Sequence, residues 1–375
     1  MAITFAMSLE ELIRQLYPAR AMALREELDI GYANHQETPT IAWIMAMVLA
    51  ESGVGHLVKS ILAYECPWAA RLAEPPIFIW EGPDGSRMLV RRRNTDYVEG
   101  RFVLKGLRPT NSALHDQIAP AYEALGDNYP FDAIALVGCY GDLDGVARDA
   151  PARKAATIGA YNAQNWDYPR LIDASHKQFW DAIDAQIASR GIRLPVSKGD
   201  YGASWDAWPA CLAHDAAGWR RAQERAATAD KLAAIATSLT PDWLTDHKAA
   251  LNEGWRNLVY LADHAWNGAN DANRGLNARL RRQWQTTANA RFDAVVADGL
   301  AMLVRHVPGG DGSRVLVFNS LGWERTGVVR MEGREGATVT DVATGEAVPA
   351  QMIELDGRPG LAFEARGVPS VGYRT

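Results

Sequence analysis

The first 200 residues alternate short apolar strands with helices, and this alternation restricts the fold more than any other feature of the sequence. Strands are expected at residues 28–33, 76–80, 87–92, 131–137 and 192–197. Helices are expected from Thr38-Pro39 to Gly53, over 152–165 and over 175–189. The pattern predicts an α/β layer with a largely parallel sheet.

Two further zones follow. Residues 205 to 305 carry three apolar stripes at helical spacing, which predict a three-helix bundle. Residues 308–312 have the composition of a linker. Short strands are expected beyond it at 314–319, 327–331, 337–342, 351–354 and 361–364. We therefore expect three domains: an α/β domain (1–204), a three-helix bundle (205–307) and a small antiparallel sheet or the start of a larger β-domain (308–375).

The charge balance and the apolar runs exclude several classes of protein. Lys plus Arg is 39 and Asp plus Glu is 45, so the net charge of −6 gives no electrostatic basis for binding nucleic acid or an anionic membrane. The longest apolar run, residues 41–50, is half the length of a membrane span. The N-terminus has no basic stretch and the three cysteines form no disulfide or metal motif. These features favour a soluble protein of the cytoplasm, and a homo-oligomer stays open.

Carboxylates follow three of the expected strands. Glu37 comes after the first strand, Asp142 and Asp144 lie past the strand at 131–137, and Asp200 lies past the strand at 192–197. Ligands of α/β sheets bind at the carboxyl ends of strands. A pair of converging carboxylates suits glycoside cleavage, in which one protonates the leaving oxygen and another attacks the anomeric carbon. Each could instead cap the helix that follows it.

The second helix of the expected bundle has an unusual polar face. Helical spacing places these residues on the face opposite the apolar stripe: Glu253, Asn257, Tyr260, His264 and Asn267. This composition indicates a face turned toward a ligand or another domain rather than toward solvent. The residues expected to line a carbohydrate site are Asp200, Tyr260, Asp263, Trp266 and Asn267. The 13 tryptophans suit sugar faces or helix packing equally.

Metal binding is not established by spacing. His264 could be a ligand only together with carboxylates from other segments, because the sequence has no HxxxH or HxH pair. A structural role for this histidine stays open.

Several motifs resemble those of the family 38 glycoside hydrolases, the α-mannosidases. The segment RVLVFNSLGWERT at 314–326 resembles the VFNPLSWER-type opening of the family's β-domain. The segment GVPSVGYR at 367–374 resembles a strand that closes its first sheet, and EGPDGS at 81–86 resembles its hairpin. The order of the three zones is also similar to the family's, so the resemblance extends over most of the chain. It implies that the α/β domain (1–204) is N-terminally incomplete and that its parallel α/β layer is a partial, barrel-like one.

This resemblance implies a retaining glycosidase of α-mannosidase type that acts on α-mannosides or related glycans with one divalent metal, usually zinc. Glu37 stands at the place of the nucleophilic, metal-binding aspartate, and Asp142 stands near the acid/base aspartate with Asp144 as a competitor. His264 stands at the helix-borne metal histidine. The family's nucleophile is Asp, and its HxD metal motif has no counterpart in this sequence. We expect either a shortened form of a longer protein or a group that has lost the metal.

Three functions follow from these observations. The first is glycoside hydrolysis by Glu37 and Asp142 with His264 completing a metal site. The second is a metal-free homologue that binds carbohydrate without turnover. The third is a structural module in which the bundle and the β-domain serve assembly.

Overall fold

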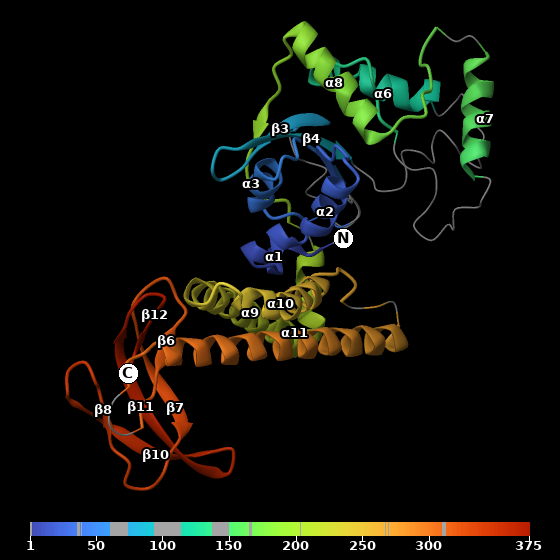
Figure 1. Ribbon diagram of the computed structural model, residues 1–375. Coiled ribbons are helices and arrows are strands. Elements are labelled where there is room, and N and C mark those ends of the chain that lie inside the picture. Colours follow the sequence, from blue (N-terminus) through green and yellow to red (C-terminus); the bar gives the residue numbers. More distant parts are fainter. Residues whose placement is uncertain are drawn as a thin grey trace. The chain divides into compact units, whose positions relative to one another are not determined.

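The computed structural model describes residues 2–35, 38, 40–60, 74–93, 114–136, 150–164, 167–202, 204–266, 268, 270–309 and 313–375 (Figure 1). The chain forms two compact units. The first comprises Met1–Ala213 and Ala262–Asn277, and the second comprises His214–Leu261 and Ala278–Thr375. No helix of the described ranges is long and apolar enough to cross a membrane.

A five-stranded mixed sheet organises the first unit. Its strands, in spatial order, are β1 (Tyr32–His35), β2 (His56–Ser60), β4 (Arg87–Arg93), β3 (Ile77–Glu81) and β5 (Val196–Ser197). β1, β2 and β4 run parallel, β3 is antiparallel to β4, and β5 is parallel to β3. The expected α/β layer is therefore present, and three of the four strand pairs are parallel.

The sheet departs from the sequence prediction at two strands. The sequence analysis did not predict β2, because this strand has only two adjacent apolar residues, which lie between His56 and Lys59. Residues 131–136, the described part of an expected strand, form no strand. Phe131 instead packs with Tyr129 in the core beside the sheet. The apolar character of this segment thus reflects the packing of aromatic side chains and not the pairing of a strand.

Helix α8 (His176–Arg190) covers one face of the sheet. Ser175 and Gln178 form a capping box at its start, and Gly191 ends it in the left-handed conformation at φ 64°. Its buried side chains Phe179, Trp180 and Ile183 pack with Val58 of β2 and Ile77 of β3.

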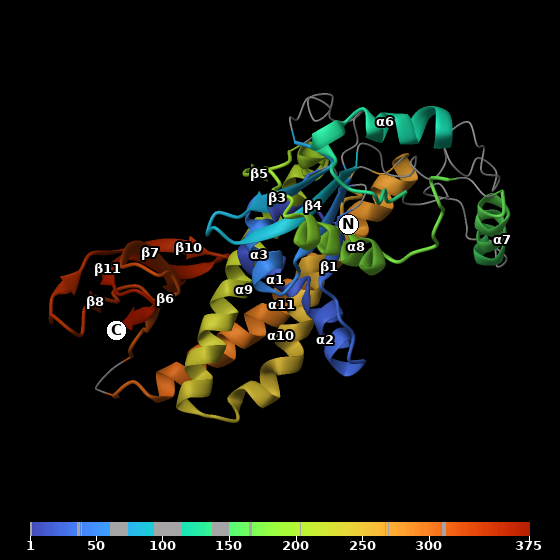
Figure 2. The same ribbon diagram turned by 90° about the horizontal axis from the view of Figure 1, so that it is seen from above.

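Helix α3 (Ile44–Glu51) covers the opposite face. Its buried residues include Met45, Val48 and Leu49, and it contacts β3, β4 and helix α1 (Leu9–Arg14). Side chains alternate between the faces of a strand, so Leu57 and Val90 point away from the α8 side. Figure 1 shows α3 and α8 on opposite sides of β3 and β4, and Figure 2 shows the same elements from above.

The remaining elements of the first unit are short. They are the α-helices α2 (Tyr17–Arg25), α6 (Ala119–Glu123) and α7 (Ala150–Asn162), 3-10 helices at Thr4–Ala6, Gly126–Asn128 and Ser204–Leu212, and a π-helical segment at Leu114–Ile118.

Three long helices form the larger part of the second unit: α9 (Ala213–Leu239), α10 (Trp243–Tyr260) and α11 (Asp271–Arg305). Glycines allow them to approach closely. A Cβ atom at Gly254 would lie 2.7 Å from the ring of Phe292, and one at Gly299 would lie 2.9 Å from Leu232 Cβ. The indole of Trp255 also donates to both carboxylate oxygens of Asp230 at 3.1 Å.

Antiparallel strands complete the second unit. β10 (Ala350–Leu355), β11 (Arg358–Val368) and β7 (Arg325–Glu332) form one sheet. β6 (Val317–Asn319) pairs with β12 (Gly372–Arg374), and β8 (Val339–Thr340) pairs with β9 (Ala347–Val348). Asp356 and Gly357 both have positive φ, as a two-residue hairpin turn between β10 and β11 requires.

We predict that Gly254→Ala destabilises the second unit by about 1–3 kcal/mol, because the added methyl group must displace the buried ring of Phe292. Urea denaturation followed by circular dichroism measures the change. Gly159→Ala is the matched control, since Gly159 lies inside α7 with nothing within 4 Å of the added methyl group. This control should leave stability unchanged or raise it by up to about 1 kcal/mol. Equal effects of the two substitutions would contradict the packing argument.

Candidate functional site

The expected catalytic carboxylates Glu37, Asp142 and Asp144, as well as Asn267, lie outside the described residues. Asp200 is described, and its carboxylate accepts a hydrogen bond of 2.7 Å from the backbone N–H of Trp43 at the start of α3. Asp200 thus bonds to the start of a helix far earlier in the chain, whereas the sequence alternative was a cap on the helix that follows it. β5 and β1 run in opposite directions, so their carboxyl ends lie at opposite ends of the sheet.

Asp200 nevertheless lies beside the segment that follows Glu37. Ile41 and Tyr201 form a two-way backbone bridge, with N–O distances of 2.7 and 3.1 Å. The contact that joins these segments is thus made by the loop after β1 and not by the ends of parallel strands.

The N-terminal residues connect this place to the segment of His264. The N–H of Ile3 donates to the carbonyl of Ala262 at 2.8 Å, and Ala2 forms a backbone bridge with Asp263. The hydroxyl of Thr4 accepts from the N–H of Ala42 at 2.9 Å. Three segments far apart in the sequence, at 41–43, 200–201 and 262–264, therefore meet within the first unit.

The structure corrects the expected helix-borne position of His264. Helix α10 ends at Tyr260, and the N–H of Leu261 turns back to the carbonyl of Leu258. His264 consequently lies in the turn region after the helix, and the polar face expected to run from Glu253 to Asn267 is interrupted. Tyr260 belongs to the second unit, is 48% exposed and has its ring 5.5 Å from that of Trp284.

Two tryptophans that the sequence analysis did not single out surround His264. The ring of Trp205 lies 5.7 Å from the imidazole at an interplanar angle of 11°, and the ring of Trp208 lies 6.4 Å away at 27°. The two indoles stack on each other at 4.0 Å. The two tryptophans are three residues apart in the segment WDAW, and in a 3-10 helix residues three apart lie on the same side of the helix. This spacing is the sequence signal from which their pairing could have been predicted.

The other residues of the His264 segment differ in exposure. Asp263 is half-exposed, and its carboxylate lies 3.6 Å from Nδ1 of His264. Trp266 is fully buried, and its carbonyl accepts from the thiol of Cys211. This burial argues against the expectation that the Trp266 ring lines a carbohydrate site, since no face of the ring is open to a ligand.

The described residues do not complete a metal site. A catalytic zinc ion takes three protein ligands, whereas His264 and Asp263 are neighbours in sequence. Among the described parts of the chain, no group of three or more His, Cys, Asp or Glu side chains could hold a metal ion.

A row of basic residues crosses the carboxyl ends of β1, β2 and β4. His35 is paired with Lys59, and Lys59 is paired with Arg92, so all three side chains project from the same face of the sheet. Lys59 is 1% exposed and donates to the carbonyl of Thr38 at 3.0 Å. Arg92 lies 3.7 Å from Glu74. Burial and the Lys59 ammonium hold the pKa of His35 well below its usual value, so this imidazole is neutral at neutral pH.

Two buried hydroxyl groups lie in the segment after β1. The hydroxyl oxygens of Thr38 and Thr40 have no hydrogen-bond partner among the described residues, which do not include their neighbours 36, 37 and 39. The imidazole of His35 has backbone hydrogen bonds with His35 and Thr38.

The opposite end of the sheet is fully paired by comparison. Glu81 lies 2.5 Å from the Lys198 ammonium and 2.7 Å from the Arg87 guanidinium. Its backbone carbonyl accepts from the indole of Trp43, and the indole of Trp80 donates to the carbonyl of Gly199. These bonds join β3 and its hairpin to the start of α3 and to the segment that follows β5.

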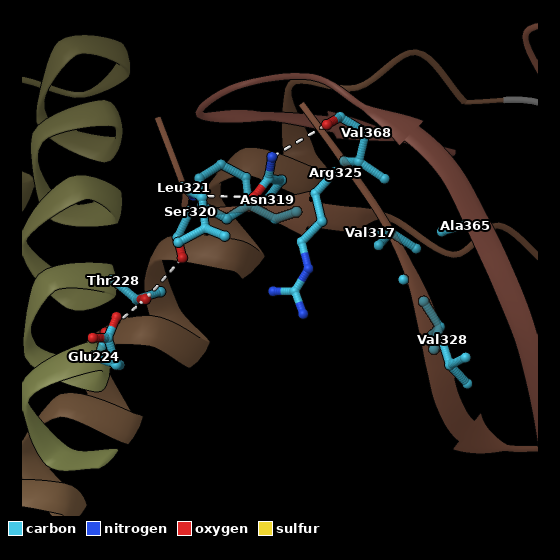
Figure 3. A pocket seen from close by; sticks show the side chains of 13 residues that line it. Glu224, Thr228, Val317, Asn319, Ser320, Leu321, Arg325, Val328, Ala365 and Val368 are labelled. Atoms are coloured by element: carbon cyan, nitrogen blue, oxygen red, sulfur yellow. Dashed lines mark hydrogen bonds between the residues drawn. The ribbon is translucent and has the colours of Figure 1, made fainter. Parts of the chain in front are cut away.

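The second unit contains a separate hollow of about 400 Å³ between α9 and the strands β6, β7 and β11 (Figure 3). Arg325 points into it, and Val317, Val328 and Ala365 line the sheet side. Thr228 of α9 donates to the hydroxyl of Ser320 at 3.0 Å. None of the expected site residues lines this hollow.

Asn319, in the motif at 314–326, has a structural role at the edge of the hollow. Its amide nitrogen donates to the carbonyls of Trp323, Val368 and Pro369, and its amide oxygen accepts from the N–H of Leu321. One buried side chain thus joins the two motifs on which the resemblance in this region rests.

Comparison with known proteins gives a likeness in fold. No family model and no curated protein matches the chain. A solved structure, an α-mannosidase from Enterococcus faecalis, superposes with a TM-score of 0.70 and 15% sequence identity. The match covers 99% of this chain and 45% of the α-mannosidase chain. The fold of this protein is therefore similar to part of an α-mannosidase, and the chain spans less than half the length of that relative.

We predict that Glu81→Gln destabilises the first unit at neutral pH. Hydrogen bonds from Lys198 and Arg87 lower the pKa of Glu81. Because the pKa of Glu81 is lower in the folded state than in the unfolded state, its ion pairs stabilise the fold fully at pH values above the unfolded-state pKa. This stabilisation is lost as the pH falls through the folded-state pKa. The difference in midpoint between wild type and variant should thus shrink on acidification. Thermal unfolding at several pH values measures it, and Glu335→Gln, at an exposed loop position, should show no difference at any pH. A pH-independent effect of Glu81→Gln would contradict the ion-pair explanation.

Proposed function

We propose that this protein is a retaining glycoside hydrolase of α-mannosidase type, acting on α-mannosides or related glycans. The observation that carries the proposal is the meeting of the segments at 41–43, 200–201 and 262–264 in a fold similar to that of an α-mannosidase. The motifs at 81–86, 314–326 and 367–374 support it independently of the fold.

Glu37 and Asp142 are the proposed carboxylate pair. In the first step the Glu37 carboxylate attacks the anomeric carbon, the bond to the leaving oxygen breaks, and Asp142 gives that oxygen its proton. In the second step Asp142 takes a proton from water, the water oxygen attacks the anomeric carbon, and the Glu37 carboxylate is released. Asp144 is the alternative acid/base residue. Asp200, Asp263 and His264 are proposed to border the sugar.

The matched variants Glu37→Gln and Asp142→Asn distinguish the two roles. We expect Glu37→Gln to abolish hydrolysis of every α-mannoside. Asp142→Asn should lose about 100-fold or more on alkyl mannosides and far less on dinitrophenyl mannoside, whose leaving group needs no proton. Rates are measured with both substrates, and Asp246→Asn, on the exposed side of α10, is the control that should keep wild-type rates.

Two outcomes would change this assignment. If Asp144→Asn and not Asp142→Asn shows the dependence on leaving group, Asp144 is the acid/base residue. If Glu37→Gln retains wild-type rates on both substrates, the proposed nucleophile is wrong.

Zinc is a prediction from the resemblance and enters no step above. If it is the resident metal, elemental analysis of the purified protein should find about one zinc per chain, because a catalytic site holds one ion on three protein ligands. His264→Ala should remove it. Lys248→Ala, an exposed substitution on α10, should not. Protein without zinc, or zinc retained in His264→Ala, would contradict the predicted metal site.

The half-buried ring of Trp208, which stacks on the buried Trp205 beside His264, favours a second candidate function, the binding of carbohydrate without turnover. Flat aromatic surfaces suit the apolar faces of sugar rings. Calorimetric titration with mannose oligosaccharides that shows binding, together with unchanged oligosaccharide after long incubation, would favour this candidate over hydrolysis.

A further inference from the structure

The hollow of about 400 Å³ in the second unit is open where two of the smallest residues face each other across the sheet (Figure 3). Gly327 of β7 is paired with Ala365 of β11, and both line the hollow. A Cβ atom at Gly327 would have one neighbour within 4 Å beyond the adjacent residues, Nε of Arg325 at 3.6 Å. This distance is an ordinary van der Waals contact, so the space beside the Gly327–Ala365 pair can accept further atoms.

The walls of the hollow around this pair are mainly apolar. The residues that form them on the sheet side are Val317, Phe318, Leu321, Val328, Val329 and Val368. Val328 is 67% exposed, so part of this apolar surface is open to a ligand. Small-molecule sites are concave, mostly apolar and about 300–1,000 Å³ in volume, with a few polar groups that orient the ligand. The hollow has the volume and the apolar walls of such a site.

Arg325 brings an unpaired positive charge to these walls. Its side chain points into the hollow in Figure 3, and no described residue forms a hydrogen bond or an ion pair with its guanidinium. Other polar groups of the hollow bond within the protein, since the amide of Asn319 donates to backbone carbonyls and the hydroxyls of Thr228 and Ser320 bond to each other. A guanidinium is a donor only, and its planar fork matches the two oxygens of a carboxylate.

A carboxylate lies on the α9 side of the same hollow. Glu224 lines the hollow, and its carboxylate forms no ion pair with Arg325 or with any other described cation. The two opposite charges therefore do not neutralise each other. A ligand with a carboxylate would bind on the side of Arg325, and Glu224 could accept a hydrogen bond only from a donor group of the ligand, such as an ammonium.

We propose that this hollow binds a small organic acid with an apolar body. The carboxylate of the ligand accepts hydrogen bonds from Arg325, and the apolar body covers the Gly327–Ala365 pair beside Val328. The shared chemistry is a carboxylate on a branched or aromatic apolar group, which either a simple organic acid or an apolar amino acid supplies. The inference does not depend on the proposed function, because no residue of the proposed active site lines this hollow.

A titration of the full chain, labelled at the valine methyl groups and followed by NMR, tests the inference. The probes are isocaproate, hydrocinnamate, leucine and isocaproamide, which has the shape of isocaproate without its charge. We expect the signals of Val317, Val328 and Val368 to shift, and at least one of the acids to bind about threefold or more tightly than the amide. Tighter binding of leucine than of isocaproate identifies an amino acid as the ligand, and the reverse order identifies a simple acid. Equal affinities for the acids and the amide, or no shift of these signals, would overturn the inference.

Two variants locate the ligand. Gly327→Val fills the open space with a residue that strands favour, so binding of all the acids should be lost. Arg325→Met removes the charge and keeps an unbranched apolar side chain, so the affinity for isocaproate should fall about threefold or more while that for isocaproamide is unchanged. Arg330→Met is the matched control, because Arg330 lies on the same strand but on its other face and does not line the hollow. It should leave both affinities unchanged. Full binding by Gly327→Val, or an unchanged ratio of the two affinities in Arg325→Met, would overturn the assignment to this hollow.

Discussion

The parallel pairing of β1 with β2 and of β2 with β4 is the constraint on which the candidate site depends. It brings three strands to a common carboxyl edge and fixes their register residue by residue. A shift by one residue would turn Lys59 and Arg92 to the α8 side of the sheet, among Phe179 and Trp180. The apolar residues that alternate with them, Val58 toward α8 and Leu57 toward the other face, oppose such a shift because each is buried where it now lies.

Hydrogen bonds of the N-terminal residues, two from the backbone and one at the Thr4 hydroxyl, add the second constraint. Residues 2–4 bond to Ala262 and Asp263 on one side and to Ala42 on the other. This short segment therefore contributes to the site by joining two others and not by its own chemistry. The sequence did not predict this link, because backbone contacts such as those of Ala2 and Ile3 depend on the path of the chain and require no particular side chains.

The parts of the fold that could be predicted from the sequence are those with local physical causes. Helix α8 has a capping box and a terminal glycine, the β10–β11 hairpin has Asp-Gly, and the three long helices have apolar stripes. The end of α10 at Tyr260 could not be predicted, because the apolar spacing continues to Ala262 and Trp266. Ala262 and Trp266 are buried, as the apolar spacing suggests, but they lie in the first unit and not on the helix. The apolar spacing therefore predicted which residues are buried but not where the helix ends.

The candidate site was predictable to a smaller degree, for a related reason. We expected the carboxylates to converge because we assumed that the strands before them run in the same direction. β3 is antiparallel to β4 and β5 is parallel to β3, so β5 runs opposite to β1. Asp200 consequently caps α3 and reaches the site segment through a loop. Trp205 and Trp208 were part of the tryptophan excess, but composition alone does not say which indoles gather around His264.

The charged groups at the two ends of the sheet are arranged differently. At the end of Glu81, two cations lie at close range to one carboxylate, and both nearby indoles donate to carbonyls. At the carboxyl ends of β1, β2 and β4, the Lys59 ammonium donates to the carbonyl of Thr38, and Arg92 lies beside Glu74. The strand register fixes both arrangements, because it pairs Glu81 with Arg87 at one end and Lys59 with Arg92 at the other. The same register buries Leu57 and Val58 on opposite faces, so the packing of the sheet also determines which charged groups meet at each end.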